Sequence, residues 1–374
     1  MPRYLVVFTA FTLATSVAGA QEAMAPAHPQ ATVSPVSAIR YEAKTPVSPV
    51  FGDNTPISFS SSRRLVGDLR ESTELSKIVE EETNLALACS GTIAKEDVAV
   101  TLLEVTPCLG GSPRFGHLHG NDPRYASGVA RVVWAAALFR ALQERAIDVN
   151  PRLEADIIKM LHDGDTKASG RIIDFVTGTR SGASLGYSCQ FAKFATKRDF
   201  ANYVLSNLGF VRFNVNQKLS TSIPSGRDAQ LLGRKLPLNY ENSNRLTSNQ
   251  AAALMYLVDQ EVLVSRCASR AIKAYLFAPL EQRKVDVLAG SSAGVPVGSQ
   301  VVTVNGYTSR NNHDVSKIVL PNGKQYVLAV FTKYRSNPTT FATLLSRQIS
   351  NRFLTATGDD DINDYLNIPA LAGQ

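Results

Sequence analysis

Residues 125–140 read Tyr125-Ala-Ser-Gly-Val-Ala-Arg-Val-Val-Trp-Ala-Ala-Ala-Leu-Phe-Arg140 and carry the strongest structural signal in the chain. Apolar residues occupy nearly every side of the helix that this stretch predicts, and the pattern continues to Gln143. A helix that is apolar all round is buried inside a protein rather than lying on its surface. We therefore expect a central helix over residues 127–143, with other elements packed around it.

The elements expected on either side of this helix change in type along the chain. Before it, hydrophobic periodicity predicts one helix and two strands. After it come helices alone, one of which begins at the capping box Thr247-Ser-Asn-Gln250, and then three strands and a last helix that opens at Asn337-Pro338. The expected helices cover residues 68–87, 150–177 (two helices, the second from near Thr166), 199–208, 250–264 and 266–277, and the expected strands cover residues 98–105, 114–119, 301–305, 315–320 and 326–331. This order indicates an α+β fold.

The start of the central helix resembles the active-site helix of class A β-lactamases and related penicillin-recognising serine hydrolases, in which aromatic-x-Ala-Ser-x-x-Lys precedes an apolar run. Further landmarks follow in the family's order: Asn244-Arg245-Leu246-Thr247 before a capped helix, residues 297–308, Asn312-His313-Asp314-Val315 and Leu320-Pro321-Asn322-Gly323. The resemblance covers residues 69–354. It implies a five-stranded antiparallel sheet flanked by helices, an all-helical lobe, and an active site between the two.

The three catalytic clusters of the family are degenerate in this chain. Registering on the apolar run places Gly128 at the serine nucleophile and Arg131 at the lysine one turn later. The family's Ser-Asp-Asn cluster corresponds to Gly164-Asp165-Thr166, and its Lys-Thr-Gly cluster corresponds to Val304-Asn305-Gly306. The Glu-x-x-Leu-Asn motif that positions the deacylating water in class A enzymes has no counterpart after the middle helices. We therefore expect a catalytically impaired protein.

The resemblance implies that such a protein binds its ligand in the cleft between the lobes. The residues expected to line that cleft are Gly128, Arg131, Asp165, Thr166, Asn305 and Gly306. The ligand would be a cell-wall peptide, a β-lactam-like small molecule or a protein partner. Two alternatives stay open: an active serine hydrolase that uses Ser127, and a structural or interaction protein whose cleft is closed by side chains.

Ser127 lies one residue before the expected nucleophile position, and two roles are possible for it. Serine is favoured at helix N-caps, and we interpret Ser127 as such a cap. As a nucleophile it would need a base from elsewhere, such as His162 or Lys167. Arg131 cannot be that base, because its guanidinium stays protonated at physiological pH.

The ends of the chain indicate an exported protein. Residues 1–20 have a basic start, an apolar stretch and an Ala18-Gly19-Ala20 end, which is typical of a cleaved signal peptide. Residues 21–64 are rich in Pro, Ala and Ser and predict a linker, whereas residues 356–374 predict an acidic mobile tail. The folded domain is thus expected at residues 65–355, in the periplasm or outside the cell, and no other apolar run is long enough to span a membrane.

Composition excludes several other function classes. The formal net charge is +7, but no Lys/Arg cluster with interleaved aromatic residues points to nucleic acid. The sequence contains no Gly-rich phosphate loop of the kind that would indicate a nucleotide cofactor. His117 and His119 lie on one expected strand, but two histidines are too few ligands for a metal site. In an oxidising compartment the four cysteines allow three pairings; we expect Cys89 with Cys108 and Cys189 with Cys267, and buried free thiols are the alternative.

Overall fold

The structure is a computed structural model that describes residues 59–90, 93–105, 112–219, 223–234, 242–277, 290–308, 311–333 and 341–355. The expected signal peptide, most of the expected linker, the acidic tail, Cys108 and Asn337-Pro338 lie outside these residues. Within the described part, no helix combines the length and the apolar character needed to cross a bilayer.

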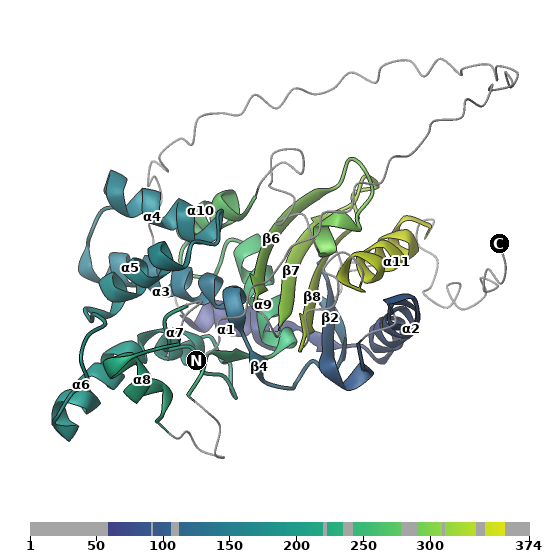
Figure 1. Ribbon diagram of the computed structural model, residues 1–374. Helices are drawn as coiled ribbons and strands as arrows, with labels where there is room; N and C mark the ends of the chain where they lie inside the picture. Colours follow the sequence, from purple (N-terminus) through teal and green to yellow (C-terminus); the bar gives the residue numbers. More distant parts are fainter. Residues whose placement is uncertain are drawn as a thin grey trace, which may run out of the picture. The chain divides into compact units, whose positions relative to one another are not determined.

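One sheet of six strands forms the framework of the domain, in the order β1-β3-β2-β8-β7-β6. The strands are β1 (Arg70–Glu71), β2 (Val98–Glu104), β3 (Arg114–Leu118), β6 (Gln300–Tyr307), β7 (Asn312–Val319) and β8 (Gln325–Thr332). Five of them pair antiparallel, as predicted, and they join the first and last segments of the chain (Figure 1).

The sixth strand, β1, corrects the five-stranded prediction and pairs parallel to β3. Its two residues fall in the segment expected to be helical. Ser72 explains the difference, because its hydroxyl accepts a hydrogen bond from the N–H of Leu75 (3.2 Å) and caps α2 (Thr73–Ser90). The residues before a cap are extended, so Arg70 and Glu71 are available for strand pairing.

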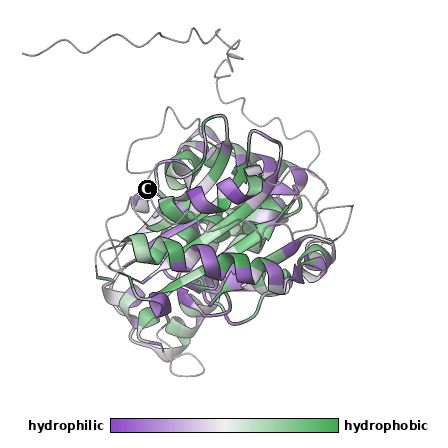
Figure 2. Cartoon of the chain, turned by 90° about the vertical axis from the view of Figure 1, so that its right-hand side faces the viewer, coloured by the Kyte–Doolittle hydropathy of each residue, from purple (hydrophilic) through white to green (hydrophobic). Residues whose placement is uncertain are grey.

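Both faces of the sheet are covered, because successive side chains along each strand alternate between two apolar clusters. One cluster packs against α2 and α11 (Phe341–Thr355) and includes Val100, Ile318 and Leu328. The other packs against α3 (Ala130–Arg145) and α9 (Ser248–Asp259) and includes Val304 and Ala329. Figure 2 shows the strands largely green, between helices whose turns alternate between purple and green.

The helical lobe surrounds α3, which confirms the prediction of a buried central helix. Trp134, Leu138 and neighbouring residues of α3 are fully buried, and the helix contacts α4, α5, α7, α9 and α10. The remaining helices of this region are α4 (Pro151–Leu161), α5 (Thr166–Thr177), α6 (Ser188–Arg198), α7 (Phe200–Asn207), α8 (Gly226–Leu232) and α10 (Arg266–Leu276).

Local capping signals predicted helix starts better than helix ends. The capping box at Thr247 and Gln250 is formed, and α5 begins at Thr166 as expected. Helix α9, however, ends at Asp259 rather than at residue 264, and α6 was not predicted. Helix α6 is polar and largely exposed, so it lacks the apolar stripe by which a helix is recognised from sequence.

Helix α1 (Phe59–Asp68) begins inside the stretch predicted to be a linker. The hydroxyl of Ser62 donates a hydrogen bond to the carbonyl of Val262 (2.5 Å). Leu65 and Val66 pack against the larger apolar cluster. Helix α1 therefore packs against the domain through Ser62, Leu65 and Val66, so the folded part begins before residue 65.

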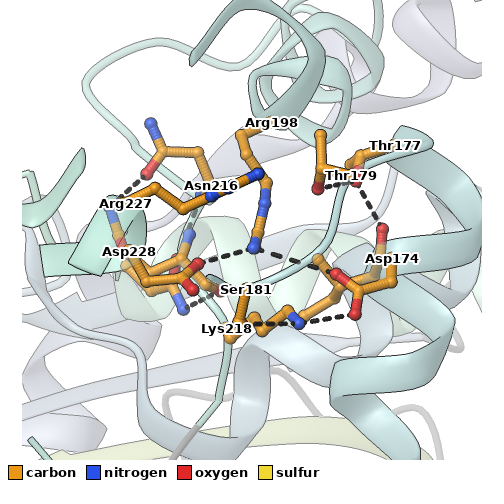
Figure 3. A network of polar contacts seen from close by, with 12 residues as sticks. Asp174, Thr177, Thr179, Ser181, Arg198, Asn216, Lys218, Arg227 and Asp228 are labelled. Carbon is orange, nitrogen blue, oxygen red and sulfur yellow. Dashed lines mark hydrogen bonds and ion pairs between the residues drawn. The ribbon is translucent and has the colours of Figure 1, made fainter. Parts of the chain in front are cut away.

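A buried ion-pair network joins three helices and a loop of the helical lobe (Figure 3). Arg198 of α6 is fully buried, and its Nη2 lies 2.6 Å from Asp228 Oδ1 of α8 and 3.9 Å from Asp174 Oδ1 of α5. Lys218 Nζ lies 2.6 Å from the other oxygen of Asp174. Two carboxylates and two cations thus compensate one another inside the lobe.

The expected disulfides are not formed. Cys89 and Cys189 both carry free thiols, so neither the Cys89–Cys108 pair nor the Cys189–Cys267 pair exists in this structure. Cys189 lies in the first turn of α6 and Cys267 in the first turn of α10. Figure 1 shows these two helices at opposite ends of the helical lobe, which explains why the second pair cannot form without a large movement.

Candidate functional site

The chain enters the candidate site through a short segment that is held on both sides. Strand β4 (Arg124–Tyr125) pairs with β5 (Arg245–Leu246), and the carbonyl of Tyr125 accepts a hydrogen bond from His313 Nε2 (2.7 Å). A 3-10 turn, Ser127–Val129, then leads into α3. The start of the central helix is thereby fixed against both the helical lobe and the sheet.

Ser127 is not a helix cap, so that interpretation was wrong. The capping positions of the 3-10 turn and of α3 are Ala126 and Val129, and neither makes a side-chain cap hydrogen bond. Ser127 itself is buried and has a φ of +46°, a conformation that non-glycine residues rarely adopt. The residue forms the bend between β4 and α3.

Gly128, at the expected nucleophile position, is in close contact with the edge strand β6. A Cβ built at Gly128 would collide with the carbonyl oxygen of Asn305 and would lie 2.5 Å from Nη2 of Arg131. A Cβ built at Gly306 would lie 2.9 Å from the Cα of Gly128. Only glycine permits two backbones to approach this closely, so no side chain fits at position 128 in this arrangement.

The guanidinium of Arg131 occupies the space between Gly128 and the second cluster. A Cβ at Gly164 would lie 2.9 Å from Nη1 and 3.0 Å from Nη2 of Arg131, and Gly164 has a φ of +70°. Arg131 is only 9% exposed, and burial lowers its pKa to about 10. The group is still protonated at neutral pH, so it is a buried cation and cannot accept a proton from a nucleophile.

The carboxylate of Asp165 serves the helix that follows it. Its Oδ1 accepts a hydrogen bond from the N–H of Ala168 (2.6 Å), which makes Asp165 the N-cap of α5. Thr166 is the half-buried first residue of that helix. The alternative bases, His162 and Lys167, are both exposed, and His162 Nδ1 lies 2.9 Å from Asp163 Oδ1.

Strand β6 presents its backbone to the site rather than a charged side chain. Val304, at the position expected for the family's lysine, packs in the apolar cluster that contains α3. Because side chains alternate along a strand, Asn305 shares the opposite face with Thr303. Asn305 therefore contributes its carbonyl to the contact with Gly128, and its amide lies on the other side of the sheet.

Comparison with known proteins shows which fold this arrangement of sheet and helices resembles. A model of the Beta-lactamase enzyme family matches residues 192–356. Comparison with curated protein sequences finds no significant match. Among solved structures, the extended-spectrum β-lactamase TLA-3 is 13% identical with a TM-score of 0.54, and the match covers 75% of this chain and 99% of that one. A β-lactamase from Sphaerobacter thermophilus (19% identity, TM-score 0.51, 75% and 96% covered) and PBP-A (16% identity, TM-score 0.50, 76% and 97% covered) are similar to a comparable degree.

The chain has the β-lactamase-like fold. This confirms the resemblance first noted at residues 125–140 and the α+β class. Relatives at these identities share a fold, and what the cleft does depends on the residues that this chain places there.

In this β-lactamase-like chain the three cluster segments converge, but their reactive groups are absent or point elsewhere. Gly128, Gly164 and the β6 backbone meet around Arg131. Ser127 lies beside Gly306, since a Cβ at Gly306 would lie 2.9 Å from the Cβ of Ser127. Acyl transfer needs a nucleophile paired with an unprotonated base. At the two positions expected for that pair, the chain has Gly128 and the protonated Arg131.

The loop after α7 was not identified from sequence as part of a polar core. Residues 208–219 contain no Asp or Glu. Oδ1 of Asn244 accepts hydrogen bonds from the backbone N–H groups of Asn216 (3.1 Å) and Gln217 (2.9 Å), and the amides of Asn214 and Asn216 both donate to Asn242 Oδ1. The loop is thus held by buried amides and offers no carboxylate to activate a water.

His313 was also missed, because sequence placed it at a strand start with no more than a local role. It is fully buried in β7 and stacks on Phe331 with a centroid distance of 4.4 Å. The N–H of Thr332 donates to Nδ1 (3.2 Å), so the ring proton lies on Nε2 and is donated to Tyr125. Both ring nitrogens are therefore engaged with the backbone, and the histidine has a structural role beside the site.

The two histidines considered as metal ligands, one in β3 and one just after it, are engaged in other contacts. His117 Nε2 lies 3.3 Å from Glu71 Oε1, and Nδ1 of His119 lies 3.0 Å from the carbonyl oxygen of Val98. Across the described residues, no group of three or more His, Cys, Asp or Glu side chains is arranged to hold a metal ion.

Proposed function

We propose that this protein is an exported, non-hydrolytic β-lactamase-like protein that binds a ligand in the cleft between its lobes. The observation that carries the proposal is the contact of Gly128 with the Asn305 carbonyl and the Arg131 guanidinium. The position from which a serine would attack is filled, and the residue in the place of the general base is a cation. Both halves of the usual reactive pair are therefore missing together.

The ligand class that we propose is a cell-wall peptide or a β-lactam-like small molecule. PBP-A, which shares the fold, is known as an acyl-enzyme complex with penicillin-G in a mutant form. A cleft of the same architecture without a nucleophile would hold such a ligand without a covalent bond. Binding energy would then be used for recognition alone rather than for stabilising a transition state.

Export to the periplasm or beyond supports the same ligand class. The first twenty residues have the layout of a cleaved signal peptide. A protein carried across the cytoplasmic membrane meets cell-wall peptides directly. Export is tested by N-terminal sequencing of the protein from its native host, where we expect a mature start near Gln21.

A second candidate is a structural or interaction protein whose cleft is closed. It is favoured by one observation, the guanidinium of Arg131 between Gly128 and Gly164. If this group excludes every ligand, the surface rather than the cleft would carry the function, and the partner would be a protein.

Incubation of the mature protein with a fluorescent penicillin tests both candidates against an active hydrolase. We expect intact-mass spectrometry to show no covalent adduct and equilibrium dialysis to show saturable, reversible binding. The Ser127→Ala variant should behave like the wild type in both measurements. A serine-linked adduct that disappears in Ser127→Ala would overturn the proposal, and absence of any binding would favour the closed-cleft protein.

A further inference from the structure

Arg131 is a buried cation without a counter-ion among the described residues. It is 9% exposed, and its Nε is sealed from solvent with no hydrogen-bond partner. Among the described residues, no carboxylate acts on the charge of Arg131. Buried charges in proteins are ordinarily paired, because an isolated charge loses its hydration without compensation.

Arg198, the other buried arginine among the described residues, has its charge compensated by carboxylates. Arg198 has Asp228 at 2.6 Å and a second carboxylate, Asp174, at 3.9 Å (Figure 3). Burial lowers the pKa of both arginines, and carboxylates oppose that effect only at Arg198. At Arg131 the opposing group is the Tyr307 hydroxyl at the end of β6.

None of the residues that surround Arg131 at the candidate site turns a carboxylate toward it. Asp165, the sole acid of the second cluster, is turned toward the N–H of Ala168 and caps α5. Gly128 and Gly164 contribute backbone alone, and neither carries a side chain that could shield the guanidinium from a ligand. The guanidinium is therefore unpaired within this cluster, and an anion that reached it would be its counter-ion.

We propose that Arg131 is the anchor of a carboxylate-binding site between the start of α3 and Gly164. The planar guanidinium presents paired N–H donors that match the two oxygens of a carboxylate, and a charge-assisted pair of this kind is strong where water is excluded. The residue in the place of the family's proton acceptor thus becomes an anion receptor. This inference rests on the proposed function, in that the carboxylate belongs to the ligand bound between the lobes.

Acetate is the probe that tests the site, with acetamide as a neutral probe of the same shape. On the full mature chain, thermal unfolding is followed against acetate concentration at constant ionic strength maintained with chloride. We expect acetate to raise the Tm in a saturable way and acetamide to leave it unchanged. In Arg131→Gln the apparent affinity for acetate should fall by about tenfold or more, the loss expected when a charge-assisted hydrogen bond is removed.

Two variants separate ligand binding from a structural role of the arginine. Arg140→Gln, on the same helix but in an exposed pair with Glu144, should respond to acetate as the wild type does. Arg131→Met removes the unpaired charge, so without acetate it should be at least as stable as the wild type, and it should not respond to acetate.

Three outcomes would overturn the inference: no acetate effect on the wild type, an equal effect of acetamide, or an undiminished effect in Arg131→Gln. A different measurement tests the proposed function: a covalent serine adduct with penicillin would contradict it. An acetate response that depends on Arg131 would support the carboxylate site even if such an adduct were found.

Discussion

At the residue scale, Gly128 brings the start of α3 into close contact with β6. Restoring the family's serine with Gly128→Ser should not restore activity, because the new side chain meets the Asn305 carbonyl and Arg131. We expect a loss of about 1–3 kcal/mol in the free energy of unfolding from overpacking, and no hydrolysis of a chromogenic cephalosporin. Urea unfolding and an absorbance assay measure the two effects.

Gly128→Ala is the matched control for this substitution. It adds volume without a hydroxyl, so it should lose a similar amount of stability. Measurable turnover by Gly128→Ser, with Gly128→Ala inactive, would show that β6 can move away and that the cleft is open in solution.

His313 makes stability depend on pH. Burial lowers its pKa from 6.5 to about 4, so between these values the unfolded chain binds more protons than the folded one. The free energy of unfolding should therefore fall as pH is lowered through this window, by about 3 kcal/mol in total at about 1.4 kcal/mol per pKa unit. Urea unfolding at a series of pH values measures this slope.

A histidine substitution assigns the slope to its source. His313→Gln should flatten the pH dependence between pH 6.5 and 4, whereas His162→Gln, at an exposed histidine, should leave it as in the wild type. An unchanged slope in His313→Gln would show that other groups cause the acid sensitivity.

At the scale of elements, short-range sequence patterns predicted most helices and strands. Contacts between distant segments could not be predicted from such patterns. The capping box of α9 was found because its two hydrogen bonds join residues only three positions apart in the sequence. The strands of the sheet were found because they are short, apolar and bounded by turns. The cysteine pairings were wrong because they depend on which distant segments meet, and strand β1 was missed because its pairing with β3 does so too.

The sequence predicted which residues lie at the candidate site, but it did not predict how they contact one another. Sequence alignment brought Gly128, Arg131 and Gly164 together correctly as neighbours. It could not show that the Asn305 carbonyl covers Gly128 or that Asp165 turns away as a helix cap. Both depend on how β6 and α5 approach α3, which no local pattern encodes.

The ion pair between α6 and α8 should matter more than surface pairs do. Asp228→Asn leaves the fully buried Arg198 with the 3.9 Å contact to Asp174 as its remaining ion pair among the described residues. We expect a loss of about 3 kcal/mol in the free energy of unfolding, the usual cost of breaking a buried pair. Glu144→Gln, which breaks the exposed pair with Arg140, should cost less than about 1 kcal/mol, and similar losses in the two variants would contradict this account.

At the scale of the whole molecule, one apolar core extends through both the sheet and the helical lobe. The larger cluster contains residues of β2, β6, β7 and β8 as well as residues of α3, α5, α7 and α9. Helix α3 therefore serves as shared interior for two parts that differ in secondary structure. Parts that share a continuous core of this kind unfold together, because neither can open without exposing the apolar surface of the other.

The only tryptophan of the chain makes this cooperativity measurable. Trp134 is fully buried in α3, so its fluorescence reports on the common core, whereas far-UV circular dichroism reports on helices and strands throughout the chain. We expect the two signals to give the same midpoint and the same slope in urea, as a two-state transition requires. If fluorescence changes at a lower urea concentration than circular dichroism, the packing around α3 is lost before the secondary structure, and the two parts do not unfold as one unit.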